Sequence, residues 1–102
     1  MNPLVERSLP QIEDLCRRYR VRSLHAFGSV LTDSFDPARS DVDFLVEFDD
    51  AASIDYVDAY FGLKENLEQL LHRPVDLITT TSLRNPYFRN QIMRTRQSLY
   101  AA

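Results

Sequence analysis

The sequence predicts a small mixed α/β (α+β) fold, in which a β-sheet is flanked by helices, and three observations support this prediction. Apolar residues recur at helical spacing in two long segments. Short segments rich in β-branched and aromatic residues lie between and after them. Helical and strand segments alternate along the chain, which favours a sheet covered by helices. With 102 residues, residues 1–102 are expected to form a single domain.

The first predicted elements are a helix over about residues 10–19 and a strand over about 22–27. Ser8 is the expected cap of the helix, and Pro10 suits its first turn. The apolar residues of this helix fall at i, i+3, i+4 and i+7: Ile12, Leu15, Cys16 and Tyr19. The strand runs into Gly28-Ser29, and residues 30–40 are expected to be irregular, with one helical turn after Ser29.

The middle of the chain predicts a strand over 41–48 followed by a long helix over about 54–72. In DVDFLVEF, every second residue is apolar, so one face of the strand should be buried: Val42, Phe44, Val46 and Phe48. Ser53 is the expected cap of the helix. Its expected apolar stripe is broad: Ile54, Val57, Tyr60, Phe61, Leu67, Leu70 and Leu71.

The last third of the chain predicts strand, helix and strand. Pro74 ends the long helix, and VDLIT (75–79) has the composition of a strand. Asn85-Pro86 fits an N-cap followed by proline in the first helical turn, so a helix is expected to about residue 95. The final SLYA is expected to be an edge strand.

Composition limits the possible functions. The chain has 44% hydrophobic residues, no apolar run long enough to cross a membrane and no secretory signal. A single cysteine, Cys16, excludes an internal disulfide, and a cytoplasmic location is expected. The net charge is −3 and the basic residues are dispersed, so stable binding of nucleic acid is not expected. The thin core and acidic surface favour homo- or hetero-oligomerisation.

Two aspartates in the 41–48 strand are the most informative residues. Side chains at i and i+2 of a strand point to the same side, so Asp41 and Asp43 should lie about 6.5–7 Å apart. At an effective dielectric constant near 20, two carboxylates at this distance repel by about 2–2.5 kcal/mol. A shared proton or a divalent cation relieves that repulsion. Carboxylate ligands without a nearby cysteine favour Mg²⁺ or Mn²⁺ over Zn²⁺.

Asp76 and Gly28-Ser29 complete a candidate site. An aspartate between Val75 and Leu77 is unfavourable in a sheet unless it has a function. If its strand lies beside 41–48, three carboxylates face one site of the kind that holds two metal ions for phosphoryl transfer. A glycine directly after a strand allows a tight turn, where backbone N–H groups and the Ser29 hydroxyl can bind phosphate oxygens.

These motifs resemble the signature of the DNA polymerase beta-type nucleotidyltransferase superfamily. The matching residues are Phe27-Gly28-Ser29, then Asp41-Val42-Asp43-Phe44 after eleven residues, then Val75-Asp76-Leu77. The short chain is most similar to the minimal nucleotidyltransferases (MNT). These proteins are typically encoded with a helical HEPN-domain toxin.

The resemblance implies a polymerase beta-type nucleotidyltransferase fold and a role for each matching residue. Asp41, Asp43 and Asp76 would be catalytic and would hold Mg²⁺, with two ions expected and Mn²⁺ possible. Gly28 and Ser29 would contact the triphosphate of ATP, the expected substrate. The implied function is an antitoxin that neutralises a HEPN-domain toxin, by adenylylating one of its tyrosines or by forming a tight complex.

One departure from the family pattern keeps alternatives open. Many relatives have a basic residue just after Gly-Ser, whereas this chain has Val30-Leu31-Thr32-Asp33-Ser34. Either Arg39 takes that nucleotide-binding role or the affinity for nucleotide is weaker. The alternatives are a non-catalytic antitoxin that keeps the fold, and nucleotidyl transfer to a small molecule such as an aminoglycoside.

Overall fold

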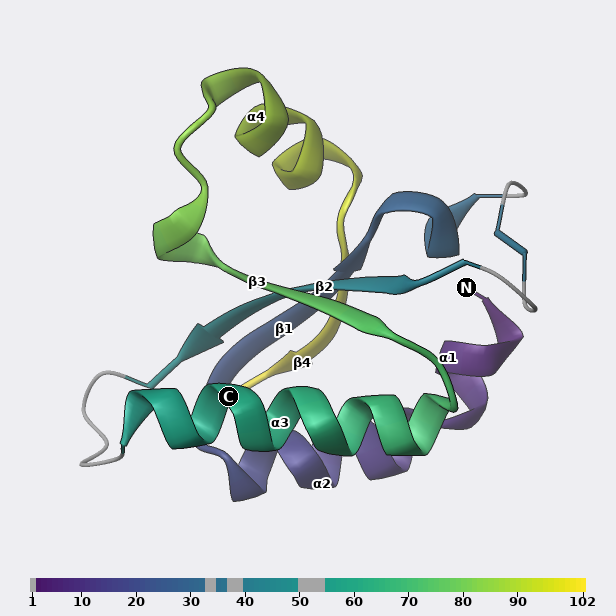
Figure 1. The fold of residues 1–102 in the computed structure, drawn as a ribbon. Coiled ribbons are helices and arrows are strands. Elements are labelled where there is room, and N and C mark those ends of the chain that lie inside the picture. Colours follow the sequence, from purple (N-terminus) through teal and green to yellow (C-terminus); the bar gives the residue numbers. More distant parts are fainter. Residues whose placement is uncertain (1, 33–34, 37–39, 50–54) are drawn as a thin grey trace.

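The computed structural model describes residues 2–32, 35–36, 40–49 and 55–102, and their strands form one sheet with helices on both faces (Figure 1). In chain order the elements are α1 (Pro3–Arg7), α2 (Leu9–Arg18), β1 (Val21–Phe27), the 3-10 helix η1 (Gly28–Leu31), β2 (Val42–Phe48), α3 (Tyr56–Leu71), β3 (Val75–Thr79), the 3-10 helix η2 (Thr80–Ser82), α4 (Pro86–Thr95) and β4 (Gln97–Ala101). The expected mixed α/β class and the expected four strands are confirmed.

The sheet has the strand order β3-β2-β1-β4, with β4 at one edge as expected. β1 is antiparallel to β2 and to β4, whereas β2 and β3 are parallel. A parallel pair needs a crossover connection, and α3 provides it for β2 and β3. α4 connects the two edge strands, β3 and β4, on the other side of the sheet (Figure 1).

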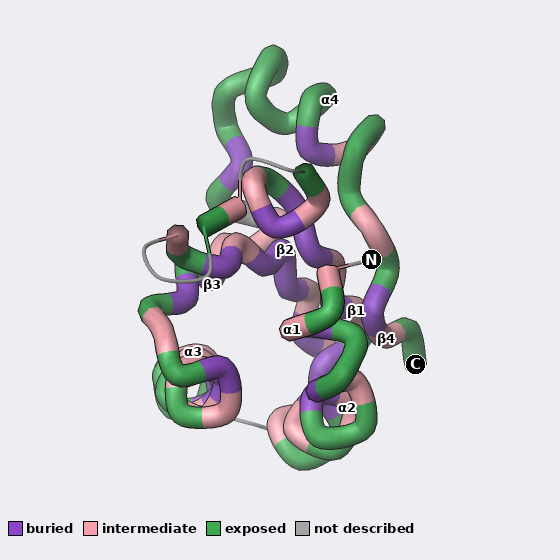
Figure 2. The backbone as a smooth tube through the Cα atoms, turned by 90° about the vertical axis from the view of Figure 1, so that its right-hand side faces the viewer, coloured by how far each residue is buried: buried purple, intermediate pink, exposed green. Residues whose placement is uncertain are grey.

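The face of the sheet covered by α2 and α3, here called the helix-packed face, holds the large hydrophobic core (Figure 2). The apolar side chains predicted for one side of β2 all lie in this core and are at most 3% exposed: Val42, Phe44, Val46 and Phe48. α2 contributes Ile12 and Cys16. Alternation along β2 therefore fixes which of its residues stabilise the protein.

The opposite face, here called the α4 face, has a much smaller core. Among the residues that the structure describes, four buried side chains form its cluster: Phe27, Leu45, Leu83 and Ile92. Ile92 is the one buried residue of α4, and Figure 2 shows most of this helix exposed. α4 therefore rests on a narrow apolar contact.

The residues at the helix N-caps agree only in part with those predicted from the sequence. Asn85 caps α4 as predicted, accepting hydrogen bonds from the Tyr87 and Phe88 N–H groups. Ser8 occupies the N-cap position of α2, but its side chain makes no capping hydrogen bond. The short α1 was not predicted. At α3 the cap is Asp55.

The prediction that Ser53 caps α3 is therefore wrong. Ser53 and Ile54 lie outside the described residues, and α3 begins at Tyr56. The side chain of Asp55 accepts hydrogen bonds from the N–H groups of Val57 and Asp58, at 3.0 and 3.2 Å. An aspartate side chain satisfies these otherwise unpaired donors at the start of a helix as well as a serine does.

The predicted apolar stripe of α3 is partly wrong as well. Val57 and Phe61 are 62% and 54% exposed, whereas the buried residues of α3 are Ala59, Leu63, Leu67 and Leu71. Residues two positions apart are separated by about 200° around a helix. The prediction thus merged two rows on opposite sides, and only the row that begins at Ala59 faces the sheet.

Candidate functional site

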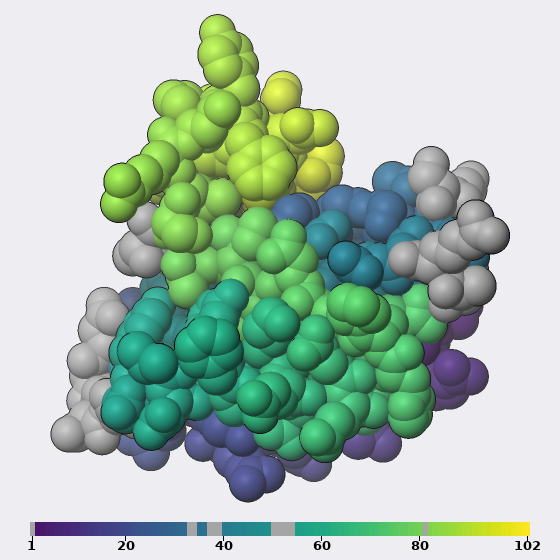
Figure 3. All heavy atoms as spheres, in the orientation of Figure 1, coloured from purple at the N-terminus to yellow at the C-terminus, as the bar shows by residue number. Residues whose placement is uncertain are grey.

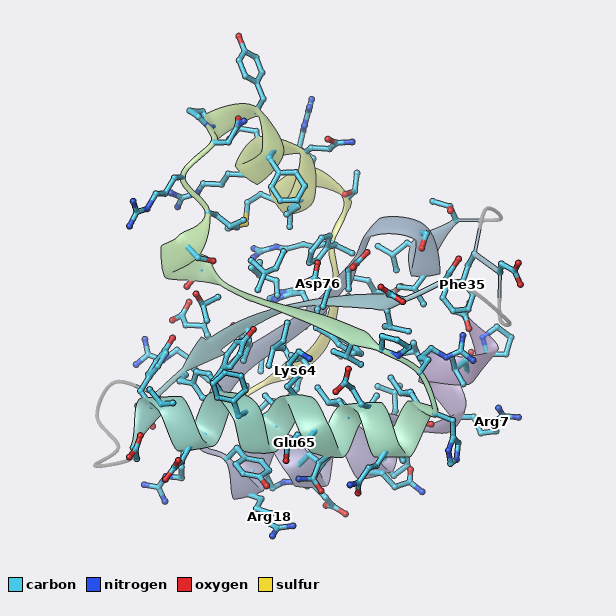
Figure 4. The ribbon with its side chains drawn as sticks, in the orientation of Figure 1. Arg7, Arg18, Phe35, Lys64, Glu65 and Asp76 are labelled. Atoms are coloured by element: carbon cyan, nitrogen blue, oxygen red, sulfur yellow. The ribbon has the colours of Figure 1, made fainter. Side chains whose placement is uncertain are left out.

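The register of the sheet brings the predicted aspartates to one end of the strands. Asp43 in β2 pairs with Asp76 in β3 in parallel register, and Phe27 at the end of β1 pairs with Asp43 from the other side. Asp41 directly precedes β2. Asp43 shares the alternation of Leu45, which packs against Ile92 of α4, so the carboxylates belong to the α4 face. In Figure 4, Asp76 lies on the sheet between α3 and α4.

Gly28 lies directly against Asp43, and two features of its geometry require a glycine at this position. Its φ angle is +76°, a region that residues with a Cβ rarely adopt. A Cβ placed on Gly28 would lie 2.5 Å from Oδ2 of Asp43. The glycine thus lets the turn after β1 pass directly against the carboxylate.

The half-buried Ser29 is the second residue of η1, so the helical turn that was expected after Ser29 already begins at Gly28. The carbonyl of Ser29 accepts hydrogen bonds from the backbone N–H and the hydroxyl of Thr32, both at 2.9 Å. These contacts hold the turn next to the aspartates. Arg39, the other predicted nucleotide-binding residue, lies outside the described residues.

The environment of Asp43 favours its protonated form. Partial burial, followed by the charges of Asp76 and then Asp41, raises the pKa of Asp43 from 3.8 to about 6. Asp41 and Asp76 are themselves exposed. Near neutral pH the end of the sheet therefore carries several negative charges whose repulsion a cation would relieve.

A cavity of about 240 Å³ opens beside the aspartates, between the sheet and α4. The lining residues come from β1, η1, β2, β3 and α4: Phe27, Gly28, Asp43, Asp76, Ile78, Phe88, Gln91, Ile92 and Thr95. None of these residues is basic. The cavity therefore combines an acidic end with largely apolar and aromatic walls.

The donor set fits Mg²⁺ as an open site. In the described part of the chain, no group of three or more Asp, Glu, His or Cys side chains lies close enough together to hold a metal ion by itself, and this includes Asp41, Asp43 and Asp76. Mg²⁺ is commonly bound by one or two carboxylates, with water and substrate phosphates completing its octahedron. Adjacent carboxylates at the mouth of a cavity without basic residues suit that mode of binding.

Sequence reasoning identified the aspartates and the Gly-Ser turn but missed the wall of the cavity formed by α4. Phe88, Gln91 and Thr95 line the cavity on that side. Their spacing of three to four residues marks one side of a helix. However, the spacing alone does not say which face of the sheet the helix covers.

Comparisons with known proteins agree on one family for this chain. The family described as nucleotidyltransferase domain matches residues 11–99 of the chain. A protein of Methanocaldococcus jannaschii, described as a putative protein adenylyltransferase, is 34% identical over 94 residues, which cover 84% of this chain and 92% of that protein.

Two solved structures have the same fold. The structure of a putative minimal nucleotidyltransferase superposes with a TM-score of 0.72 at 29% identity, covering 91% of this chain and 90% of that one. The second is a complex of a tri-AMPylated HEPN toxin with its MNT antitoxin, from Shewanella oneidensis. It superposes with a TM-score of 0.65 at 21% identity, covering 95% of this chain and 72% of that one.

Proposed function

This chain belongs to the nucleotidyltransferase domain family, and we propose that it transfers the adenylyl group of ATP to a tyrosine hydroxyl of a HEPN-domain toxin and so acts as its antitoxin. The observation that carries the proposal is the pairing of Asp43 with Asp76, beside Gly28, at the mouth of the 240 Å³ cavity. This arrangement offers carboxylates for a metal and a walled space for the reacting group.

Asp43 and Asp76, which pair between β2 and β3, would hold Mg²⁺ together with Asp41, and water and substrate phosphates would complete its coordination. When bound, Mg²⁺ neutralises the charge of the triphosphate and of the leaving pyrophosphate. Gly28 and Ser29 are the proposed contacts of the triphosphate. Since Gly28 has no side chain, phosphate oxygens can approach its backbone closely.

In the proposed reaction, the oxygen of the acceptor hydroxyl attacks the α-phosphorus of ATP. A new oxygen–phosphorus bond forms, and the bond between the α-phosphorus and its bridging oxygen to the β-phosphorus breaks. Pyrophosphate leaves with that electron pair. The carboxylate of Asp76 accepts the proton of the hydroxyl, because an exposed carboxylate at the cavity is available as a base.

The acceptor is proposed from two lines of support. The Shewanella complex, which has the same fold, pairs an MNT antitoxin with an AMPylated HEPN toxin. In addition, the cavity walls include Phe27, Phe88 and Ile92, and such walls suit a planar aromatic ring beside the aspartates. A tyrosine ring combines that shape with a hydroxyl.

A second candidate, a non-catalytic antitoxin that neutralises its partner by binding alone, is favoured by one observation. No basic residue follows Gly28-Ser29 in η1, and Val30 is buried at 2% exposure. This turn therefore offers no cation to the triphosphate.

A transfer assay separates the two candidates. The protein is incubated with ATP labelled at the α-phosphate, Mg²⁺ and the HEPN-domain protein encoded beside it. We expect label on the partner, and a loss of about 100-fold or more for Asp43→Asn and Asp76→Asn. Asp58→Asn, which removes an exposed carboxylate on α3, is the matched control and should transfer normally.

The catalytic proposal fails if no label reaches the partner and Asp43→Asn still neutralises the toxin as well as the wild type does. That result would establish the binding-only antitoxin. Removing Mg²⁺ with EDTA provides an independent check, because it should abolish transfer but leave a binding-only complex intact.

A further inference from the structure

The charges of this chain are unevenly distributed along the sequence. Residues 77–102 contain four arginines and no Asp or Glu, so this segment carries a net charge of +4. The first 76 residues contain eight basic and fifteen acidic residues, a net charge of −7. The positive segment includes α4, the helix that forms one wall of the cavity.

The four arginines of this segment are all available for intermolecular contacts. Arg84, Arg89, Arg94 and Arg96 are exposed, and none of them forms a salt bridge with the residues that the structure describes. By contrast, Arg17 and Arg22, which lie elsewhere on the molecule, are paired with acidic side chains. The positive charge around α4 is thus not neutralised within the described part of the chain.

Aromatic side chains accompany these arginines. Tyr87 is 88% exposed and Phe88 is 44% exposed, both in the first turn of α4. Tyr87 and Arg94 also line an open hollow of about 500 Å³ together with Asn90 and Met93. Figure 3 shows α4 projecting from the rest of the molecule. Exposed tyrosine and arginine are the residue types that dominate binding energy at protein interfaces.

α4 separates this hollow from the site of the aspartates. Phe88, Gln91 and Thr95 line the cavity that contains Asp43 and Asp76. The hollow is lined by Tyr87, Asn90, Met93 and Arg94, which interleave with those residues along the helix. A protein seated on α4 is consequently next to the mouth of the cavity.

We propose that α4, with its Arg89 and Arg94 and the flanking Arg84 and Arg96, forms the docking surface for an acidic surface of the protein whose hydroxyl is adenylylated. This inference rests on the proposed function and adds the chemistry of the acceptor. Acidic side chains of the acceptor pair with the arginines, while its neutral hydroxyl enters the cavity beside the aspartates. Such complementary charges accelerate association and fix its orientation.

Nucleic acid fits this surface less well than an acidic protein does. A phosphate backbone lying across α4 would continue towards Asp41, Asp43 and Asp76, which repel it. A protein acceptor can instead place its negative charges only where the arginines are. The occupant favoured by this charge distribution is therefore an acidic protein surface.

The first test measures docking without ATP, so that it does not depend on catalysis. The full chain is titrated against a fluorescent random copolymer of Glu and Tyr, and against a matched copolymer of Lys and Tyr. We expect binding of the acidic copolymer only, weakening as salt is raised. Arg84→Glu/Arg94→Glu should weaken that binding at least 10-fold.

The matched control is Arg7→Glu/Arg18→Glu, which changes the net charge equally. Both of these arginines are exposed, and Figure 4 shows them on α1 and α2, far from α4. The control should alter binding by less than about threefold. Circular dichroism and thermal unfolding verify that both double variants are folded, as expected for exposed positions.

The second test adds labelled ATP and Mg²⁺ to the same copolymers. Faster transfer to the acidic copolymer, lost in Arg84→Glu/Arg94→Glu, supports the docking surface. Specific binding of the acidic copolymer without any transfer also supports the docking surface, but contradicts the proposed catalytic activity. Equal transfer to both copolymers, unaffected by the arginine changes, overturns docking while catalysis stands. Docking is also overturned if a single-stranded RNA oligonucleotide binds α4 more tightly than the acidic copolymer and displaces it.

Discussion

The two faces of the sheet are built differently. Of the described residues, 18 are buried in the main core, between the sheet and helices α2 and α3, whereas four are buried in the cluster on the α4 face. Burial of apolar surface is the main stabilising contribution to folding, so the helix-packed face supplies most of the stability. The α4 face can therefore carry repelling carboxylates and an open cavity without unfolding the protein.

β2 combines both properties in a single strand. Val42, Phe44 and Val46 point into the main core and are fully buried. Asp43, between two of them, lines the cavity on the other face. Strand alternation lets adjacent residues serve stability and chemistry separately.

If the helix-packed face supplies stability and the α4 face supplies the chemistry, Asp76→Asn and Leu63→Ala should have opposite effects, and this comparison is the sharpest test. Asp76→Asn should lower transfer by about 100-fold or more and leave the free energy of unfolding nearly unchanged, since Asp76 is exposed. Leu63→Ala should lower the free energy of unfolding by about 2–5 kcal/mol, because Leu63 is fully buried in the main core. Its transfer per folded molecule should stay normal. Urea unfolding and labelled transfer measure the two effects. If each variant lost both stability and transfer, the two faces would not have separate roles.

The pH dependence of stability provides the next test, in the absence of divalent cations. The pKa of Asp43 is raised from 3.8 to about 6, so its protonated form is favoured in the folded protein. The resulting stabilisation is complete below pH 3.8 and is lost as the pH rises through 6. At pH 7.5, Asp43→Asn should therefore be more stable than the wild type by about 1–2 kcal/mol, after allowance for solvent screening.

The same comparison at pH 3.5 should give equal stabilities for Asp43→Asn and wild type. Urea unfolding at both pH values measures this difference. Addition of Mg²⁺ at pH 7.5 should stabilise the wild type and leave Asp43→Asn unchanged. A difference between the two proteins that is independent of pH would mean that Asp43 is not the titrating group.

The two glycines, one on each face, offer a comparison of intermediate size. Gly28→Ala places a Cβ 2.5 Å from Asp43 Oδ2 at a φ of +76°, which should cost about 1–2 kcal/mol and displace the carboxylate. In Gly62→Ala, the new Cβ lies 2.7 Å from Cε1 of Tyr19, and the higher helix propensity of alanine offsets the required shift of the ring. Only Gly28→Ala should reduce transfer. Reduced transfer in Gly62→Ala would show that the helix-packed face also shapes the site.

The smallest expected effects come from the caps of α3 and α4. Asp55→Ala removes the cap of a helix that covers the main core and should lower global stability by about 1 kcal/mol. Asn85→Ala removes the cap of α4 and should mainly accelerate amide hydrogen exchange within that helix. Equal effects of both changes on global unfolding would indicate that α4 is as strongly coupled to the core as α3 is.

Part of the site could be predicted from sequence because strand alternation is a strong constraint. Alternation put Asp41 and Asp43 on one side of their strand, and a glycine directly after a strand indicated the turn at Gly28. Whether Asp76 joins them depended on its strand lying beside 41–48, which the parallel register shows. The exposure of Val57 and Phe61 could not be predicted, since helical spacing defines rows of residues but not which row meets the sheet. The contribution of α4 was missed for a related reason: the face on which a helix packs is set by the whole topology.

The connection of the edge strands through α4 has a practical consequence. Because β3 and β4 hold the two ends of α4, the helix is anchored at both edges of the sheet. The Ala102 N–H still bonds to the Arg22 carbonyl at 2.8 Å. A change that loosened either edge strand would therefore also displace α4 and the residues with which it lines the cavity.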